Sequence, residues 1–291
     1  MAIQDSTFAV LALLDNATKR VIRRLLSMTL GEERRDLWLG ALDHTFHRRA
    51  STGFGGPLNG SPTRLAAFEE LKRRCSSAAV IETGTYRGES TVFFASAGCP
   101  VYSGEVNPRY LGYARARLRS QSNAHLYLGD SRQFLRRLIQ DPTVPKDRVF
   151  FYLDAHATGP CVDHGSGHED LPLREEVDLI FRHWTQPVVM VDDFQVPDDS
   201  GYQFEDYGEG KTLCLAYLNP VAHLELIPFF PSLPSSEEVG LKQGWVVLAS
   251  DRFCINQLRG IAQLREWRQP KRWREQAASR ASDAWCEPPS A

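Results

Sequence analysis

Short apolar segments alternate with helix-forming segments between residues 61 and 191. Five of the apolar segments have the length and composition of buried strands, at residues 78–82, 101–105, 125–128, 149–153 and 187–191. Helices are predicted between and around them, at residues 63–75, 90–97, 108–120, 131–139 and 173–184. Because strand–helix–strand units form parallel pairs, this alternation predicts a doubly wound, mostly parallel α/β sheet with helices on both faces.

The segments on either side of this alternation have a different character. Residues 1–60 predict a helical N-terminal cap, which ends in a linker with four glycines and one proline in its last ten residues. Residues 61–250 predict the α/β domain, with an antiparallel pair at residues 224–230 and 244–249 along one edge. Residues 251–291 predict a basic extension that contains three of the six tryptophans. The two terminal segments suggest packing against a second copy of the chain, as a homodimer.

Composition excludes several classes of protein. The 34 Lys and Arg residues nearly balance the 36 Asp and Glu residues, which argues against a protein that coats nucleic acid. Six scattered cysteines without a CxxC pair indicate free thiols in a reducing compartment. No apolar run approaches the roughly 18 residues that a membrane-spanning helix needs. The chain is therefore expected to be a soluble cytoplasmic protein.

The turn after the first predicted strand has the sequence ETGTYRGEST, from Glu82 to Thr91. Its glycines allow a sharp turn and a close approach to a ligand, and the following helix offers free N–H groups. The turn is not the GxGxxG of dinucleotide-binding proteins, and the carboxylate of Glu82 would repel a pyrophosphate. An acidic residue at this point instead suits a ligand that carries an ammonium group.

Polar residues also follow the next two strands, where an open parallel sheet binds its ligands. Glu105 ends the second strand, 21 residues beyond Gly84, which is the usual place for a carboxylate that binds two ribose hydroxyls. Gly129-Asp130-Ser131 follows the third strand, and its polar groups could recognise the edge of an adenine. Each residue alone could be an ordinary strand-end residue, but their ordered recurrence favours a nucleoside ligand.

Together these motifs resemble those of class I S-adenosylmethionine-dependent methyltransferases, over roughly residues 63–250. The resemblance implies a Rossmann-like fold in which the glycine turn holds the methionine part of the cofactor. The residues implied for that part are Glu82, Gly84, Thr85, Tyr86 and Ser90. The same resemblance implies that Glu105 binds the ribose and that Asp130 and Ser131 lie beside the adenine.

Three carboxylates follow the fourth and fifth strands, in Leu153-Asp154-Ala155-His156 and Val191-Asp192-Asp193-Phe194. Carboxylates at neighbouring strand ends repel one another strongly unless a cation lies among them. An all-oxygen ligand set suits Mg²⁺, which could bind an acceptor hydroxyl and lower its pKa. The alternative is that Asp192 and Asp193 cap a loop while Asp154 only contacts the cofactor.

This arrangement is similar to that of macrocin-type sugar O-methyltransferases and, more distantly, of catechol-type enzymes. The resemblance implies that Asp154, Asp192 and Asp193 are metal ligands, and that the acceptor is a hydroxyl of a sugar or polyhydroxylated small molecule. His156 is the candidate general base beside Asp154, because its pKa lies near neutrality.

Two loops and three rival functions stay open. The loop 157–170 is richer in His than that family leads us to expect, and it could bind zinc, contact substrate or be solvated. The segment 196–211 mixes aromatic and acidic residues, which suits either a sugar surface or packing on the core. The rivals are a metal-independent methyltransferase with His156 as base, a non-catalytic cofactor-binding or scaffold protein, and a nucleotide-dependent oxidoreductase. Glu82 and the missing GxGxxG argue against the oxidoreductase, and nothing favours an RNA or protein acceptor.

Overall fold

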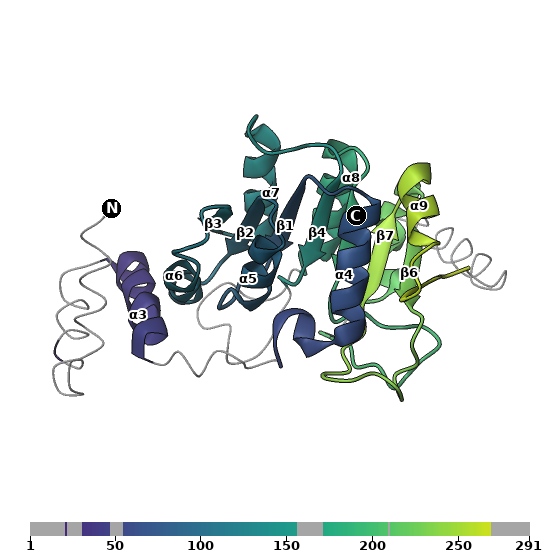
Figure 1. Cartoon of the computed structure of the whole chain (residues 1–291), viewed down its shortest axis with the longest axis horizontal. Coiled ribbons are helices and arrows are strands. Elements are labelled where there is room, and N and C mark those ends of the chain that lie inside the picture. Colours follow the sequence, from purple (N-terminus) through teal and green to yellow (C-terminus); the bar gives the residue numbers. More distant parts are fainter. Residues whose placement is uncertain (1–20, 22–30, 47–54, 156–170, 209, 269–291) are drawn as a thin grey trace, which may run out of the picture.

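The computed structural model describes residues 21, 31–46, 55–155, 171–208 and 210–268. Within these ranges one eight-stranded sheet has the order β3-β2-β1-β4-β5-β7-β6-β8 (Figure 1). Five strands run parallel: β1 (Ala79–Thr83), β2 (Val101–Glu105), β3 (Ala124–Leu128), β4 (Val149–Leu153) and β5 (Val188–Val191). Three strands pair antiparallel: β6 (Ile227–Pro231), β7 (Val246–Ala249) and β8 (Leu264–Glu266). The predicted doubly wound, mostly parallel sheet is confirmed.

The chain reverses its direction across the sheet at β1. This strand pairs with β2 on one side and with β4 on the other, so successive crossovers spread outward from it in both directions. Ligands of doubly wound sheets bind at such a switch point, beyond the carboxyl ends of the strands. The predicted antiparallel pair of β6 and β7 is also confirmed, but β7 rather than β6 lies next to β5.

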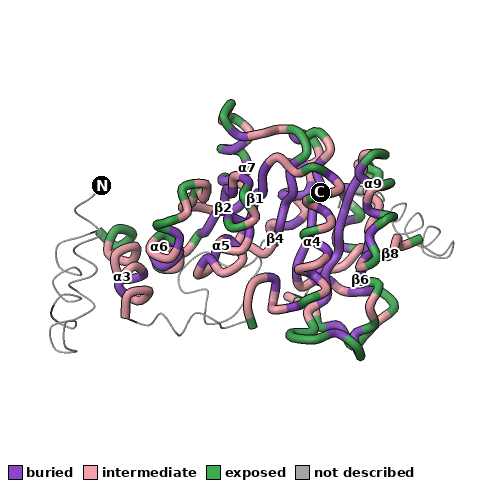
Figure 2. Tube along the Cα trace, in the orientation of Figure 1, coloured by how far each residue is buried: buried purple, intermediate pink, exposed green. Residues whose placement is uncertain are grey.

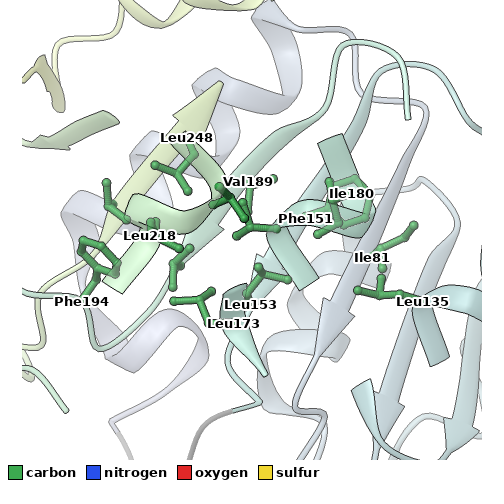
Figure 3. Close-up of a cluster of buried hydrophobic side chains, with 14 of the residues drawn as sticks. Ile81, Leu135, Phe151, Leu153, Leu173, Ile180, Val189, Phe194, Leu218 and Leu248 are labelled. Carbon is green, nitrogen blue, oxygen red and sulfur yellow. The ribbon is translucent and has the colours of Figure 1, made fainter. Parts of the chain in front are cut away.

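Helices cover both faces of the sheet, because the core strands alternate apolar side chains between the two faces. Ile81, Phe151 and Val189 face α7 (Ser131–Gln140), α8 (Leu173–His183) and the 3₁₀ segment η3 (Leu215–Leu224), as Figure 3 shows. The alternate residues Val80, Phe150 and Val188 face the opposite layer. That layer contains α4 (Pro62–Arg74), α5 (Glu89–Ser96), α6 (Pro108–Arg117) and α9 (Arg252–Leu258). Figure 2 shows the central strands buried between these helices.

Side-chain caps fix the starts of several of these helices. Ser61 accepts a hydrogen bond from the N–H of Arg64 and so begins α4, with proline at the first helical position. Asn107 and Asp130 cap α6 and α7 in the same way, immediately after β2 and β3. The caps therefore turn the chain from strand to helix at the carboxyl edge of the sheet, where the candidate ligand-binding residues lie.

Helix α3 (Glu32–Phe46) is the described part of the predicted helical cap, and it packs closely against α6 at one end of the molecule (Figure 1). A Cβ atom on Gly40 would lie 1.8 Å from the carbonyl oxygen of Arg109, and one on Gly112 would lie 2.0 Å from that of Leu37. The two helices thus approach backbone to backbone. An ion pair of 2.7 Å between Arg109 and Asp43 flanks the crossing.

At the other end, the sheet continues into the segment predicted as a C-terminal extension. Strand β8 pairs with β6, and the ring of Trp267 packs edge-on against Phe230 at 5.9 Å. Cys75, Cys99, Cys214 and Cys254 are free thiols, as predicted for the cysteines that the structure describes. None of the helices in the described ranges has the length and apolar character to cross a bilayer.

Substitution of Gly112 by alanine should destabilise the protein. The added Cβ would force α3 away from α6, and overpacking of this kind costs about 1–3 kcal/mol. That loss exceeds the gain in helix propensity, which is at most about 1 kcal/mol. Urea unfolding measures the difference, with Gly31→Ala as the control because a Cβ at Gly31 meets nothing within 4 Å. A Gly112→Ala protein as stable as the wild type would contradict the close crossing.

Candidate functional site

The glycine turn after β1 lies tightly against the ends of two neighbouring strands. Gly84 has a φ of +87°, and a Cβ at this position would lie 2.2 Å from the carbonyl oxygen of Asp154. The amide groups of Gly84 and Thr85 both donate to the carbonyl oxygen of Gly104, at 3.0 and 3.1 Å. Only glycine combines the positive φ of this position with the close approach to the backbone of Asp154. The turn is therefore fixed at the switch point between β1, β2 and β4.

Glu82 lies inside the sheet rather than on its rim, and only 1% of the residue is exposed. The hydroxyls of Thr91 and Ser103 both donate to its Oε2, and Ser103 also lies 2.6 Å from the hydroxyl of Thr85. Burial raises the pKa of Glu82 to about 7, against the opposing effect of these hydroxyls. Its other oxygen, Oε1, has no donor among the described residues. A ligand ammonium group would suit that oxygen.

Glu105 is buried at the end of β2 and holds the backbone of the glycine turn. Its Oε2 accepts a 2.7 Å hydrogen bond from the amide of Tyr86, and its Oε1 accepts a 2.8 Å bond from the amide of Asn107. Burial raises the pKa of the carboxyl, and these amide donors oppose the shift. Each carboxylate oxygen can accept a second hydrogen bond. The pair of oxygens is thus suited to two adjacent hydroxyls of a ligand.

Of the two predicted adenine residues after β3, Asp130 already has partners within the protein. Asp130 caps α7 through a 2.9 Å bond from the amide of Arg132, and it also pairs with the guanidinium of that residue at 3.0 Å. Ser131 is buried directly behind it. Ser90, in the first turn of α5, accepts a 3.2 Å hydrogen bond from the amide of Leu58. The structure therefore brings the predicted cofactor residues to one edge of the sheet, with Asp130 also required for its helix.

A third buried carboxylate, which the sequence analysis did not predict, lies beside Glu82 and Glu105. Glu176 in the first turn of α8 is fully buried, and neither of its carboxylate oxygens has a hydrogen-bond partner in the described structure. Burial raises its pKa to about 7, while the nearby hydroxyls of Ser131 and Thr83 lower it. The hydroxyl of Thr83 likewise lacks a partner. Unsatisfied buried polar groups of this kind call for a bound water or ligand group.

At the carboxyl end of β5, the carboxylate of Asp192 is fully buried and accepts from four donors of the described ranges. Its Oδ1 accepts from the guanidinium of Arg64 and, at 2.9 Å, from the amide of Asp193. Its Oδ2 accepts from the side-chain amide of Asn59 at 2.9 Å and from the hydroxyl of Tyr152. A carboxylate offers about four lone-pair positions, so these four donors saturate it.

Asp154 and Asp193 differ from Asp192 in being partly accessible. Burial and the carboxylates of Asp192 and Asp193 hold the pKa of Asp154 well above its usual value. Burial and Asp192 raise the pKa of Asp193 to about 8, and Arg64 opposes that shift. Gln243 donates to Asp193 at 2.8 Å. Because Asp192 is saturated, the predicted set of three Mg²⁺ ligands does not fit this arrangement. No group of three or more His, Cys, Asp or Glu side chains in the described ranges could hold a metal ion.

Two tyrosines of the segment 196–211 pack in or against the hydrophobic core. Tyr202 is buried, and its hydroxyl bonds to the carbonyl oxygen of Leu233 at 2.9 Å and lies 3.1 Å from Glu238. The hydroxyl of Tyr207 is buried without a hydrogen-bond partner among the described residues. Burial raises its pKa, as do the carboxylates of Glu205, Asp193 and Asp154. The ring of Tyr207 packs against the hydrophobic core, and the carboxylates that follow β4 and β5 act on its buried hydroxyl.

The other predicted residues fall outside the part of the chain that the structure describes. These are His156, the candidate base, and the whole of the loop 157–170 with Cys161, His164 and His168. Their predicted roles stay predictions.

No protein-family model and no curated protein matches this sequence. Among solved structures, the fold is similar to that of an O-methyltransferase from Bacillus cereus in complex with S-adenosylhomocysteine, with 13% identity and a TM-score of 0.47 over 79% of this chain and 97% of that chain. It is also similar to TomG, an O-methyltransferase of tomaymycin synthesis from Streptomyces achromogenes, with 15% identity and a TM-score of 0.44 over 79% and 96% of the two chains. An rRNA methylase from Streptococcus thermophilus shares 17% identity at a TM-score of 0.41 over 65% and 96%. At these values the similarity assigns no residue and no substrate to this chain.

Substitution of Glu176 by glutamine should change how stability depends on pH. The folded-state pKa of about 7 lies above the ordinary value of 4.5, so the folded state holds a proton that the unfolded state releases. The contribution of Glu176 is therefore fully favourable below pH 4.5 and is lost as the pH rises toward 7, by about 3 kcal/mol. Denaturant unfolding from pH 4.5 to 8 should show the free energy of unfolding of Glu176→Gln rising by that amount relative to the wild type. A constant difference across this range would show that Glu176 titrates normally.

Proposed function

We propose that this chain is an S-adenosylmethionine-dependent O-methyltransferase. The observation that carries the proposal is the buried carboxylate of Glu105, whose two oxygens each hold one backbone amide of the switch-point turn and can each accept one more hydrogen bond. A ribose presents two adjacent hydroxyls, which match that capacity. The proposal is also supported by the ETGTYRGEST turn, whose motif resembles that of class I methyltransferases.

The remaining residues of this edge suit the other parts of the cofactor. We assign the ammonium group of its methionine part to Glu82 Oε1, and its carboxylate to the backbone of the turn from Gly84 to Tyr86. The adenine is assigned to the surface beside Asp130 and Ser131, where the side chain of Asp130 at the same time holds α7. When bound, the cofactor supplies a methyl group that an oxygen nucleophile can accept.

The acceptor is assigned to the rim formed by Asp154, Asp193 and Tyr207. Carboxylates and a phenol hydroxyl next to one another favour a ligand with several hydroxyls, such as a sugar or another polyhydroxylated small molecule. The acceptor hydroxyl must lose its proton as it attacks, and two residues are candidates to receive it: Asp154, which is partly accessible, and His156. Saturation of Asp192 favours the alternative in which this proton transfer needs no Mg²⁺.

Substitution of Glu105 by glutamine should weaken cofactor binding. Glutamine keeps the shape but replaces one acceptor oxygen by an NH₂ group, which turns toward either a backbone amide or a ribose hydroxyl. A loss of about 5- to 150-fold in affinity is expected, since an unpaired buried group costs about 1–3 kcal/mol. Equilibrium dialysis with radiolabelled S-adenosylmethionine measures it, with Glu70→Gln on the outer surface of α4 as the control. Equal affinities of the two variants for S-adenosylmethionine would contradict the assignment of Glu105 to the cofactor site.

Substitution of Tyr207 by phenylalanine should impair methyl transfer without affecting cofactor affinity. The hydroxyl has no partner within the described structure, so its loss leaves the fold intact and removes one contact to the acceptor. We expect kcat/KM to fall about 10-fold, measured as transfer of radiolabelled methyl to hexoses, nucleotide sugars and catechol. The control is Tyr202→Phe, which removes the buried bond to Leu233 and should lower stability instead. A kcat/KM of Tyr207→Phe equal to that of the wild type would contradict a contact between the Tyr207 hydroxyl and the acceptor.

A further inference from the structure

Arg64 lies in the first turn of α4, and its side chain is 1% exposed. Its guanidinium forms an ion pair with Asp192 through Nη1, and its Nη2 donates to the carbonyl oxygen of Gln243. The side chain of Gln243 in turn donates to Asp193. The guanidinium is thus held from two sides, and its charge is permanent because arginine does not deprotonate in proteins.

We propose that Arg64 is the resident cation of the carboxylate cluster formed by Asp154, Asp192 and Asp193, and that this cluster consequently binds no divalent metal ion. Direct measurement of metal binding tests this inference independently of the proposed function. Only its consequence for activity, that methyl transfer proceeds without Mg²⁺, rests on that function. Arg64 is in this sense a positioning residue, which acts through Asp192.

Two features of the contacts support this inference. Asp192 is adjacent to Asp193 in the chain and lies beside Asp154, because Leu153 pairs with Val191 and the amide of Asp192 donates to the carbonyl oxygen of Leu153 at 3.1 Å. A metal ion shared by the three would therefore need an oxygen of Asp192. Each oxygen of that carboxylate already accepts from two donors.

The charge on Arg64 adds a second obstacle. A divalent ion bound to Asp192 would lie close to the buried guanidinium, and like charges repel strongly where water is excluded. Arginine could make room only by leaving the interior, and this would break its bond to Gln243 as well as its ion pair. The buried guanidinium of Arg64 therefore excludes a divalent metal ion from Asp192.

The contacts to Asp192 also come from a continuous stretch of chain. Asn59 lies in the 3₁₀ segment η2 (Pro57–Gly60), directly before α4, and it donates to the oxygen that Arg64 does not contact. Residues 59–64 thus supply both a neutral and a charged donor to the end of β5.

The test is a titration of the full-length chain with Mn²⁺, followed by electron paramagnetic resonance of the free ion, without cofactor. The wild type and Arg64→Lys, which keeps a positive charge, should show no saturable site up to 1,000 micromolar, a range of about three decades above a typical micromolar site. Arg64→Gln removes the charge and frees one lone pair of Asp192. It should gain one saturable site with a dissociation constant at least 10-fold below that limit, and the double variant Arg64→Gln/Asp192→Asn should lose the site.

Two results would overturn the inference. One is a stoichiometric, micromolar Mn²⁺ site in the wild type that Asp192→Asn abolishes. The other is an Arg64→Gln protein with a native circular dichroism spectrum and no gain in Mn²⁺ affinity. If Arg64→Gln does not fold, the wild-type titration alone decides, because a site there contradicts the inference and its absence supports it. Binding of S-adenosylhomocysteine, measured separately in excess chelator, shows whether the proposed function fails independently.

Discussion

The buried ion pair between Arg64 and Asp192 connects the first helix of the α/β domain to the end of its fifth strand. Neither charge is accessible to water, so each depends on the other and on the neutral donors around them. The pair fixes where α4 begins relative to β5, and through Asn59 it also fixes the segment η2. Because Leu58 in η2 bonds to Ser90, the same interaction reaches the start of α5 and the glycine turn. The two halves of the candidate site are therefore joined by this pair.

The parallel strands impose the second constraint on the site. Their carboxyl ends converge at one edge, so the polar residues that follow them are crowded together whether or not a ligand is bound. The protein satisfies most of these groups internally, with hydroxyls on Glu82, backbone amides on Glu105, and Arg132 on Asp130. Glu82 Oε1 and Glu105 can accept further hydrogen bonds and are assigned to the cofactor, whereas the unpaired carboxylate of Glu176 has no assigned ligand.

Most of the fold could be predicted from the sequence, because strand and helix periods are local properties. The five parallel strands, their helices and the β6–β7 pair all lie close to the predicted ranges. The position of β7 next to β5 and the addition of β8 could not be predicted in this way. Those pairings join segments that are far apart in the sequence, and local periodicity does not specify such partners.

The site could be predicted only in part. Strand-end residues such as Glu105 and Asp192 were found because topology alone brings them together, whereas Arg64 and Glu176 were missed because they lie within helices. A signal for both exists in the sequence. Arg64 lies four residues before Phe68, and Glu176 lies four before Ile180, so each charged residue occupies the buried, apolar face of its helix. A charge at such a position must find a partner or a ligand inside the protein.

The measurement that tests the account most directly is a calorimetric titration of the whole chain with S-adenosylhomocysteine, in excess chelator and again with Mg²⁺. The account predicts one site with a dissociation constant in the micromolar range, about −8 kcal/mol, and the same value in both solutions. Failure to bind in either solution would contradict the assignment of the switch-point turn to this cofactor. Binding of NAD in its place would replace the methyltransferase with the oxidoreductase alternative.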